Sequence, residues 1–129
     1  MNLKSNSIIS QKSQKELFEF LTDLNNFEQL MPENIQKFEV EGESFIFGLK
    51  GMPEIRLIMQ EKVEYSKIVL AAASSKLPFT LTLNIDAVDD NSSESQLFFK
   101  GDFNPMMDMM IKGPLQKFIN TLSENMAKL

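Results

Sequence analysis

The sequence predicts an α+β domain in which one antiparallel sheet of seven strands folds around a single long helix at the C-terminal end. Two observations support this fold class. Over most of the chain before residue 104, apolar and polar side chains alternate with a period close to two, which is typical of strands. From residue 104 onward the period becomes helical, and the apolar side chains fall within one sector of about 100°. This apolar stripe consists of Met107, Ile111, Leu115, Phe118, Leu122, Met126 and Leu129.

Length and composition limit what the chain can be. Its 129 residues suffice for one domain, residues 1–129, which needs no metal or disulfide to stabilise its core. The sequence contains no cysteine, which excludes disulfides, thiol nucleophiles and thiolate metal ligands. It also contains no histidine, the usual general base and the commonest metal ligand. We therefore expect neither a metal site nor a bound cofactor.

The charge and the apolar runs restrict the partners and the location. The formal net charge is −5 and Arg56 is the only arginine, so nucleic acid and anionic membrane surfaces are poor partners. The first residues contain no apolar segment of signal-peptide length, and the longest uncharged apolar run, residues 68–73, is too short to cross a bilayer. We expect a cytoplasmic protein with no membrane-inserted segment. The sequence leaves open whether it is a monomer or a homodimer.

The chain is expected to begin with a strand and to continue with two short helices. Residues 3–10 have a weak strand pattern. Ser13 and Glu16 then form a capping box ahead of an apolar run, which predicts a helix from about Gln14 to Leu24. A further short turn of helix is expected over residues 27–31. These helices are expected to close one end of the sheet.

Six further strands are predicted between residues 35 and 103. The first two form a hairpin, because Phe38 and Val40 alternate with glutamates and Gly42-Glu43 supplies a tight turn. The others cover residues 55–64, 68–74, 79–87 and 96–103. Residues 71–73 are all alanine, and these small side chains are expected to leave room in the wall of the sheet.

The C-terminal helix has a predicted start and a predicted bend. Asn104 is a favourable N-cap, and Pro105 follows at the first helical position, where the missing N–H costs nothing. Pro114 removes the hydrogen bond to the carbonyl of Met110 and is expected to kink the helix. Because the apolar stripe keeps its phase on both sides of Pro114, we predict one bent helix rather than two independent helices.

Four segments resemble the SRPBCC superfamily, which is also called START-like or birch-pollen-allergen-like and includes proteins of the polyketide cyclase/dehydrase family. The segments are Ile9 with residues 17–23, residues 30–32, Asn104-Pro105, and residues 113–115. The resemblance covers essentially the whole chain. It implies a helix-grip fold, in which a strongly curved sheet surrounds the last helix and an apolar cavity lies between them. It also implies that the loops 50–54 and 74–78 lie at the mouth of this cavity.

The first hypothesis for function is binding of a small hydrophobic ligand, such as a lipid, an isoprenoid, a quinone or a polyketide-like molecule. Inward strand positions are nearly all apolar, and the flexible methionines Met106, Met107, Met109 and Met110 suit varied ligand shapes. The predicted pocket residues are Phe47, Leu57, Met59, Leu70, Ala72, Leu81, Leu83, Phe99, Met107, Ile111, Phe118 and Leu122. The predicted mouth residues are Gly51, Met52, Pro53, Lys76, Leu77 and Pro78.

The second hypothesis is a cyclase- or dehydratase-like enzyme, by analogy with the superfamily. Such chemistry needs an acid or a base in the pocket, and the weak candidate is Glu61, which shares the inward register of its strand. Tyr65, Asp108 and Asn125 are further candidates. A β-bulge or the strand's end would instead place Glu61 in solvent. That interpretation, with the absence of histidine, cysteine and a carboxylate pair from the predicted pocket, leads us to predict no catalytic residue.

The third hypothesis is a protein-interaction module whose core is filled. The same apolar stripes are equally typical of packed side chains, and a cavity below about 300 Å³ would favour this alternative. The surface hints are two apolar residues expected on the outer face of the sheet, Ile46 and Phe98.

Overall fold

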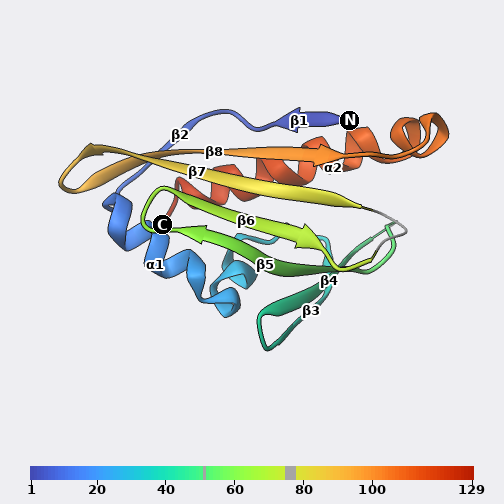
Figure 1. Ribbon diagram of the computed structural model, residues 1–129, viewed down its shortest axis with the longest axis horizontal. Coiled ribbons are helices and arrows are strands. Elements are labelled where there is room, and N and C mark those ends of the chain that lie inside the picture. Colours follow the sequence, from blue (N-terminus) through green and yellow to red (C-terminus); the bar gives the residue numbers. More distant parts are fainter. Residues whose placement is uncertain (51, 75–77) are drawn as a thin grey trace.

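The chain folds into a single sheet with its helices packed on one face (Figure 1). The structure is a computed structural model that describes residues 1–50, 52–74 and 78–129. The strands are β1 (Asn2–Lys4), β2 (Ile8–Ser10), β3 (Ile35–Glu41), β4 (Ser44–Leu49), β5 (Ile55–Val63), β6 (Lys67–Ala72), β7 (Phe79–Asp89) and β8 (Ser92–Gly101). Their order is β1-β8-β7-β6-β5-β4-β3, with β2 also paired to β8, and all pairs are antiparallel. The predicted α+β class is confirmed.

The predicted first strand, residues 3–10, is divided into β1 and β2, so that eight strands occupy the seven predicted positions. Ser5 lies between the two parts. Its N–H donates to the Leu97 carbonyl at 2.9 Å, and its Oγ accepts from the Leu97 N–H at 3.0 Å. Because a side chain replaces a backbone carbonyl as the acceptor, the regular ladder is interrupted at this residue.

Two short helical segments follow β2, as predicted: α1 (Gln14–Thr22) and the 3₁₀ helix η1 (Leu24–Leu30). The capping box at the start of α1 is present, since Ser13 Oγ accepts from the Glu16 N–H and the Glu16 carboxylate accepts from the Ser13 N–H, each at 3.1 Å. The hydrogen bond from the Ser13 backbone holds the pKa of Glu16 below its ordinary value. The helix start that the sequence predicted is therefore confirmed.

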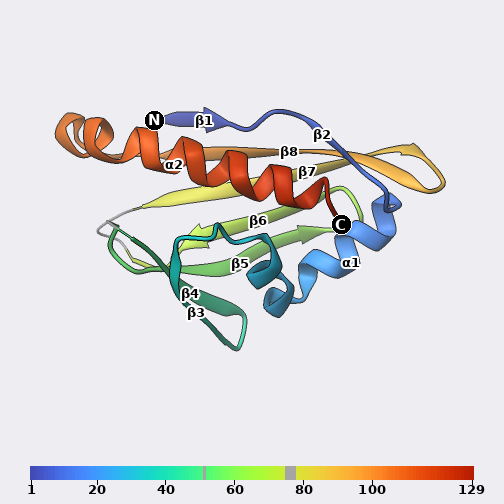
Figure 2. The ribbon, with the colours of Figure 1, turned by 180° about the vertical axis from the view of Figure 1, so that it is seen from behind.

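The last helix, α2 (Pro105–Met126), runs along the inner face of the sheet and crosses in front of β7 and β8 in Figure 2. Asn104 Oδ1 caps it by accepting from the Met107 N–H at 2.8 Å. The helix continues through Pro114 as one element, as predicted. Its buried side chains are Leu115, Phe118, Ile119, Leu122, Ser123 and Met126. Among the described residues, no helix is both long and apolar enough to span a membrane.

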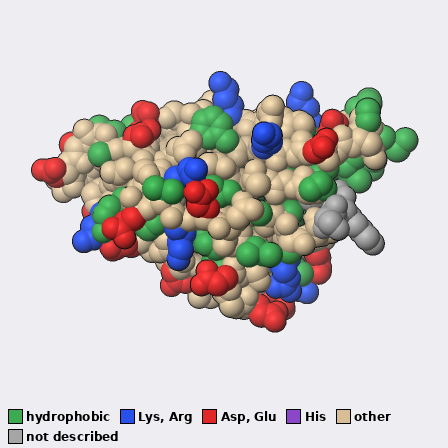
Figure 3. Space-filling model, in the orientation of Figure 1, with side chains coloured by type: hydrophobic (Ala, Val, Ile, Leu, Met, Phe, Trp, Pro, Cys, Tyr) green, Lys and Arg blue, Asp and Glu red, His purple; other side chains and the backbone are tan. Residues whose placement is uncertain are grey.

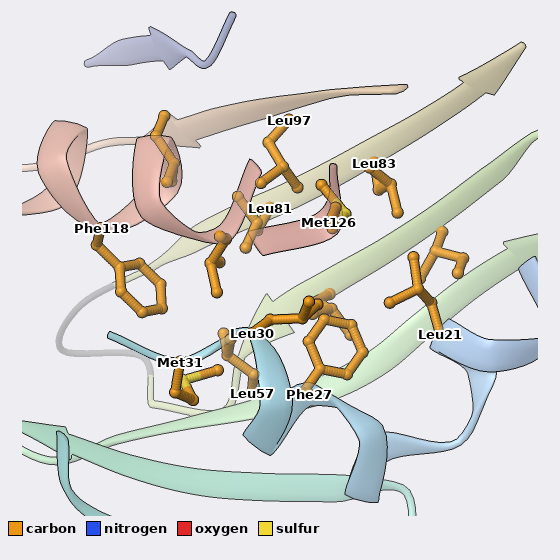
Figure 4. Packing of buried hydrophobic residues seen from close by; sticks show 14 of the residues in the cluster. Leu21, Phe27, Leu30, Met31, Leu57, Leu81, Leu83, Leu97, Phe118 and Met126 are labelled. Carbon is orange, nitrogen blue, oxygen red and sulfur yellow. The ribbon is translucent and has the colours of Figure 1, made fainter. Parts of the chain in front are cut away.

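Side chains from α2, η1 and the inner face of the sheet meet in one core (Figure 4). Phe118 of α2 stacks on Phe47 of β4, with the ring centroids 5.0 Å apart. Phe27 of η1 stacks on Phe45 of β4 at 5.3 Å. Because α2 and η1 both pack on β4, these ring contacts fix the two helical elements relative to the sheet.

The packing of α2 should account for a large share of the stability. Leu122 is 2% exposed, so we expect Leu122→Ala to lower the free energy of unfolding by about 2–5 kcal/mol, because it leaves a cavity in the core. Met109 in the same helix is 86% exposed, and Met109→Ala should change that free energy by less than about 0.5 kcal/mol. Urea unfolding of both variants measures the difference. Equal losses would contradict the placement of α2.

Candidate ligand-binding site

The middle of the core is filled. Four of the predicted pocket residues, Leu70, Leu81, Leu83 and Leu122, border a void of only about 10 Å³, together with Phe27, Leu30, Ile68, Leu97 and Met126. This volume is at the lower limit for a single water molecule. The side chains of η1 and the end of α2 occupy the space that a central cavity would need, so these four residues contribute to packing.

A larger hollow lies at the other end of the core, between the first half of α2 and the segment that follows β4. This hollow, here called the apolar pocket, has a volume of about 230 Å³. Its walls are Met52, Pro53, Ile55, Phe79, Phe103, Met107, Met110, Ile111, Pro114 and Leu115. Every one of these side chains is apolar, so the pocket has no side-chain group that would fix a charge.

The apolar pocket contains some of the residues that the sequence singled out. Met107 and Ile111 were predicted as pocket residues, and Met52 and Pro53 as mouth residues. Gly51, Lys76 and Leu77 lie outside the described residues. Pro78 and Ala72 border a separate open hollow of about 890 Å³ at the ends of β6, β7 and β8. The remaining predicted pocket residues belong to the core: Phe47, Leu57, Phe99 and Phe118 are buried and Met59 is half-buried. Phe118 also lines the groove described below.

Two phenylalanines of the apolar pocket were missed as site residues. Phe79 begins β7, Phe103 follows β8, and both rings pack on Phe99, with centroid distances of 4.9 and 6.2 Å. Gly101 makes room for this arrangement, because a β-carbon at position 101 would lie 2.6 Å from Cε2 of Phe103. The sequence did contain a signal for them. Both are aromatic residues in the inward register, and each lies at the end of a predicted strand.

A groove along α2 adjoins the apolar pocket and shares two wall residues with it. It has a volume of about 750 Å³. Its walls are Pro32, Glu33, Asn34, Leu49, Lys50, Met52, Gly113, Pro114, Lys117, Phe118 and Thr121. Met52 and Pro114 belong to both walls, so these two side chains form the partition between the groove and the apolar pocket.

Glu61, the weak candidate for a catalytic acid or base, lies on the surface. A register shift between Met59 and Glu61 in the pairing of β5 with β6 reverses the direction of the later side chains. The Glu61 side chain is 52% exposed and forms an ion pair with Lys67, the nitrogen and oxygen being 3.6 Å apart. The bulge that the sequence allowed for is therefore present.

None of the other three candidates lines the apolar pocket. Tyr65 contacts Phe18 edge to face, and a side-chain hydrogen bond with Glu64 raises the pKa of Tyr65. Asn125 donates to the Leu30 carbonyl at 2.8 Å. Asp108 borders a hollow formed with Met1, Asn2, Met109 and Lys112. Within the described residues no titratable side chain lines the apolar pocket, and no group of three acidic residues could hold a metal ion.

Comparison with known proteins establishes the fold. No protein-family model matches the sequence, and no curated protein is significantly similar to it. Among solved structures, a truncated norcoclaurine synthase from Thalictrum flavum has a TM-score of 0.75 and 10% identity, over 99% of this chain and 91% of that one. The same enzyme in complex with dopamine and hydroxybenzaldehyde has a TM-score of 0.73 and 9% identity, over 99% and 84% of the two chains. A conserved protein from Geobacillus kaustophilus has a TM-score of 0.71 and 10% identity, over 99% and 93%.

These likenesses confirm the helix-grip fold that the resemblance implied. At 9–10% identity they establish the arrangement of the backbone but say nothing about the chemistry of the site. Residues of the apolar pocket and the groove must therefore support any statement about function.

The close approach of Phe103 to Gly101 leads to a stability prediction. Gly101→Ala should lower the free energy of unfolding by about 1–3 kcal/mol, because the added methyl group overlaps the Phe103 ring. In the Phe103→Ala background the same substitution should cost less, since the ring is gone. Gly48→Ala in β4 is the matched control, because the atoms nearest its β-carbon position, Cγ of Glu54 and Cβ of Lys37, lie at ordinary contact distances of 3.4 and 3.6 Å, and we expect a change of less than about 1 kcal/mol. Urea unfolding measures all four variants, and an undiminished cost in the Phe103→Ala background would contradict this contact.

Proposed function

We propose that the protein is a member of the SRPBCC superfamily that binds a small hydrophobic molecule in the apolar pocket. The observation that carries this proposal is that a hollow of about 230 Å³ with only apolar walls lies beside a core whose middle is filled. A cavity of about 150 Å³ with similar walls takes up benzene in another protein. The apolar pocket is therefore large enough for one ring with short substituents, or for a chain of about eight carbons.

The size of the apolar pocket narrows the ligand classes. At about 230 Å³ it is below the roughly 300 Å³ at which pockets begin to enclose a drug-sized molecule, and by the criterion given for the third hypothesis this volume counts in favour of the interaction module. The proposal is therefore limited to a ligand of which a small apolar part enters the pocket. A whole quinone, isoprenoid or long-chain lipid would exceed it, whereas one end of such a molecule fits. The groove of about 750 Å³ offers space for the remainder.

The walls of the apolar pocket can adapt to a ligand. Met52, Met107 and Met110 contribute unbranched side chains that rotate with little strain. Rotation of Met52, which is half-buried, would join the apolar pocket to the groove. Norcoclaurine synthase, which has the same fold, has been observed with dopamine and hydroxybenzaldehyde bound, and its example supports ligand binding without identifying the ligand here.

An interaction module is the second candidate, and the surface at the start of α2 supports it. Met106, Met109 and Met110 are 74%, 86% and 67% exposed, and hydrophobic side chains gather over this end of the molecule in Figure 3. Phe98 is 37% exposed, whereas Ile46 is half-buried. An enzyme is a weaker proposal, because the walls of the apolar pocket supply no acid or base.

We further propose a cytoplasmic location, which the absence of cysteine allows.

Binding of 1-octanol tests the proposal. In a titration followed by ¹H–¹⁵N correlation spectra, we expect saturable shifts of amides around the apolar pocket and a dissociation constant of roughly 10 µM to 1 mM. Ile111→Trp should weaken binding at least about tenfold, because the indole fills the pocket. Met109→Trp adds the same ring to an exposed position of α2 and should leave binding unchanged. No saturable shifts, or an equal loss in both variants, would favour the interaction module.

A further inference from the structure

The groove beside the apolar pocket carries more positive than negative charge. Its charged residues are Lys50, Lys117 and Glu33, which give a net charge of +1 in a chain whose net charge is −5. In the described part of the chain, the ion pairs involve Lys37, Arg56 and Lys67, so neither groove lysine is neutralised by a carboxylate. Both ammonium groups are thus available to a ligand.

The two lysines stand beside the partition between groove and pocket. Lys50 precedes Met52 by two residues, and Lys117 follows Pro114 by one turn of α2. Met52 and Pro114 are the residues shared by the two hollows. A ligand that leaves the apolar pocket across this partition would pass between the segments that bear the two ammonium groups.

We propose that the hydrophobic ligand carries an anionic head group, a carboxylate or a phosphate, which Lys50 and Lys117 bind in the groove while the apolar part occupies the pocket. This inference rests on the proposed function. An apolar pocket without polar side chains can hold only a hydrocarbon part, so the lysines beside it supply the polar half of the recognition. Lysine acts as a flexible point charge without the planar fork of arginine, so the site should recognise charge more than head-group shape.

Three matched probes test the charge requirement: octanoate, octyl phosphate and 1-octanol, which share one chain length. The quantity measured is the ratio of the dissociation constant of 1-octanol to that of each anion, from the same amide titrations. In Lys50→Glu/Lys117→Glu this ratio should fall roughly tenfold, because attraction becomes repulsion at both positions. Lys112→Glu/Lys128→Glu changes the net charge equally at exposed positions outside the groove, and the ratio should fall less than about twofold.

Glu33 provides a test of the opposite sign. Glu33 lines the groove and repels an anion, so Glu33→Gln should raise the ratio for octanoate about twofold to threefold and leave 1-octanol binding unchanged. The ratio in the unmodified protein should also shrink in 0.5 M salt, because the lysines are exposed to screening ions.

The outcomes separate the inference from the function on which it rests. If 1-octanol binds and the two double variants lower the ratio equally, the head-group inference is wrong and the apolar pocket remains the ligand site. If no probe binds, the proposed function fails and the inference fails with it. A fall confined to octanoate would identify a carboxylate as the head group, and a fall confined to octyl phosphate would identify a phosphate.

Discussion

The contact between α2 and the inner face of the sheet is the constraint on which the rest of the structure depends. Leu115, Phe118, Ile119 and Leu122 bury one side of the helix, and the Phe118 ring stacks on Phe47 of β4. Burial of each such side chain stabilises the fold by about 1.5–3 kcal/mol, so these four side chains together contribute a large part of the stability. The strands on either side must curve towards the helix to reach it.

This constraint also explains where the molecule is hollow. At one end η1 supplies Phe27 and Leu30, which close the space against the last turns of α2 and leave almost no void. At the other end none of the helices in the described residues lies beneath α2, and methionine, proline and phenylalanine side chains enclose the apolar pocket incompletely. The position of one short 3₁₀ helix therefore decides which end of the core is packed and which end remains hollow.

The positions of most helices and strands could be predicted from the sequence, because the signals for them are local. The capping box at Ser13, the N-cap at Asn104 and the strand periodicity each act over a few residues. The interruption at Ser5 was not predicted, since its Oγ bonds a residue far along the chain, Leu97. The location of the pocket was predicted only in part. Periodicity says which side chains face inward, but the volume left between them depends on how closely segments distant in the sequence approach one another.

The exposed methionines at the start of α2 make one wall of the apolar pocket chemically vulnerable. Met110 is 67% exposed and lines the pocket, whereas Met126 in the core is 1% exposed. Conversion of an exposed thioether to the sulfoxide replaces a flexible apolar group by a polar one, and reductases can reverse it. An oxidant would therefore alter the polarity of the pocket before it reached the core, so that the proposed ligand would bind less tightly to the oxidised protein while the fold persisted.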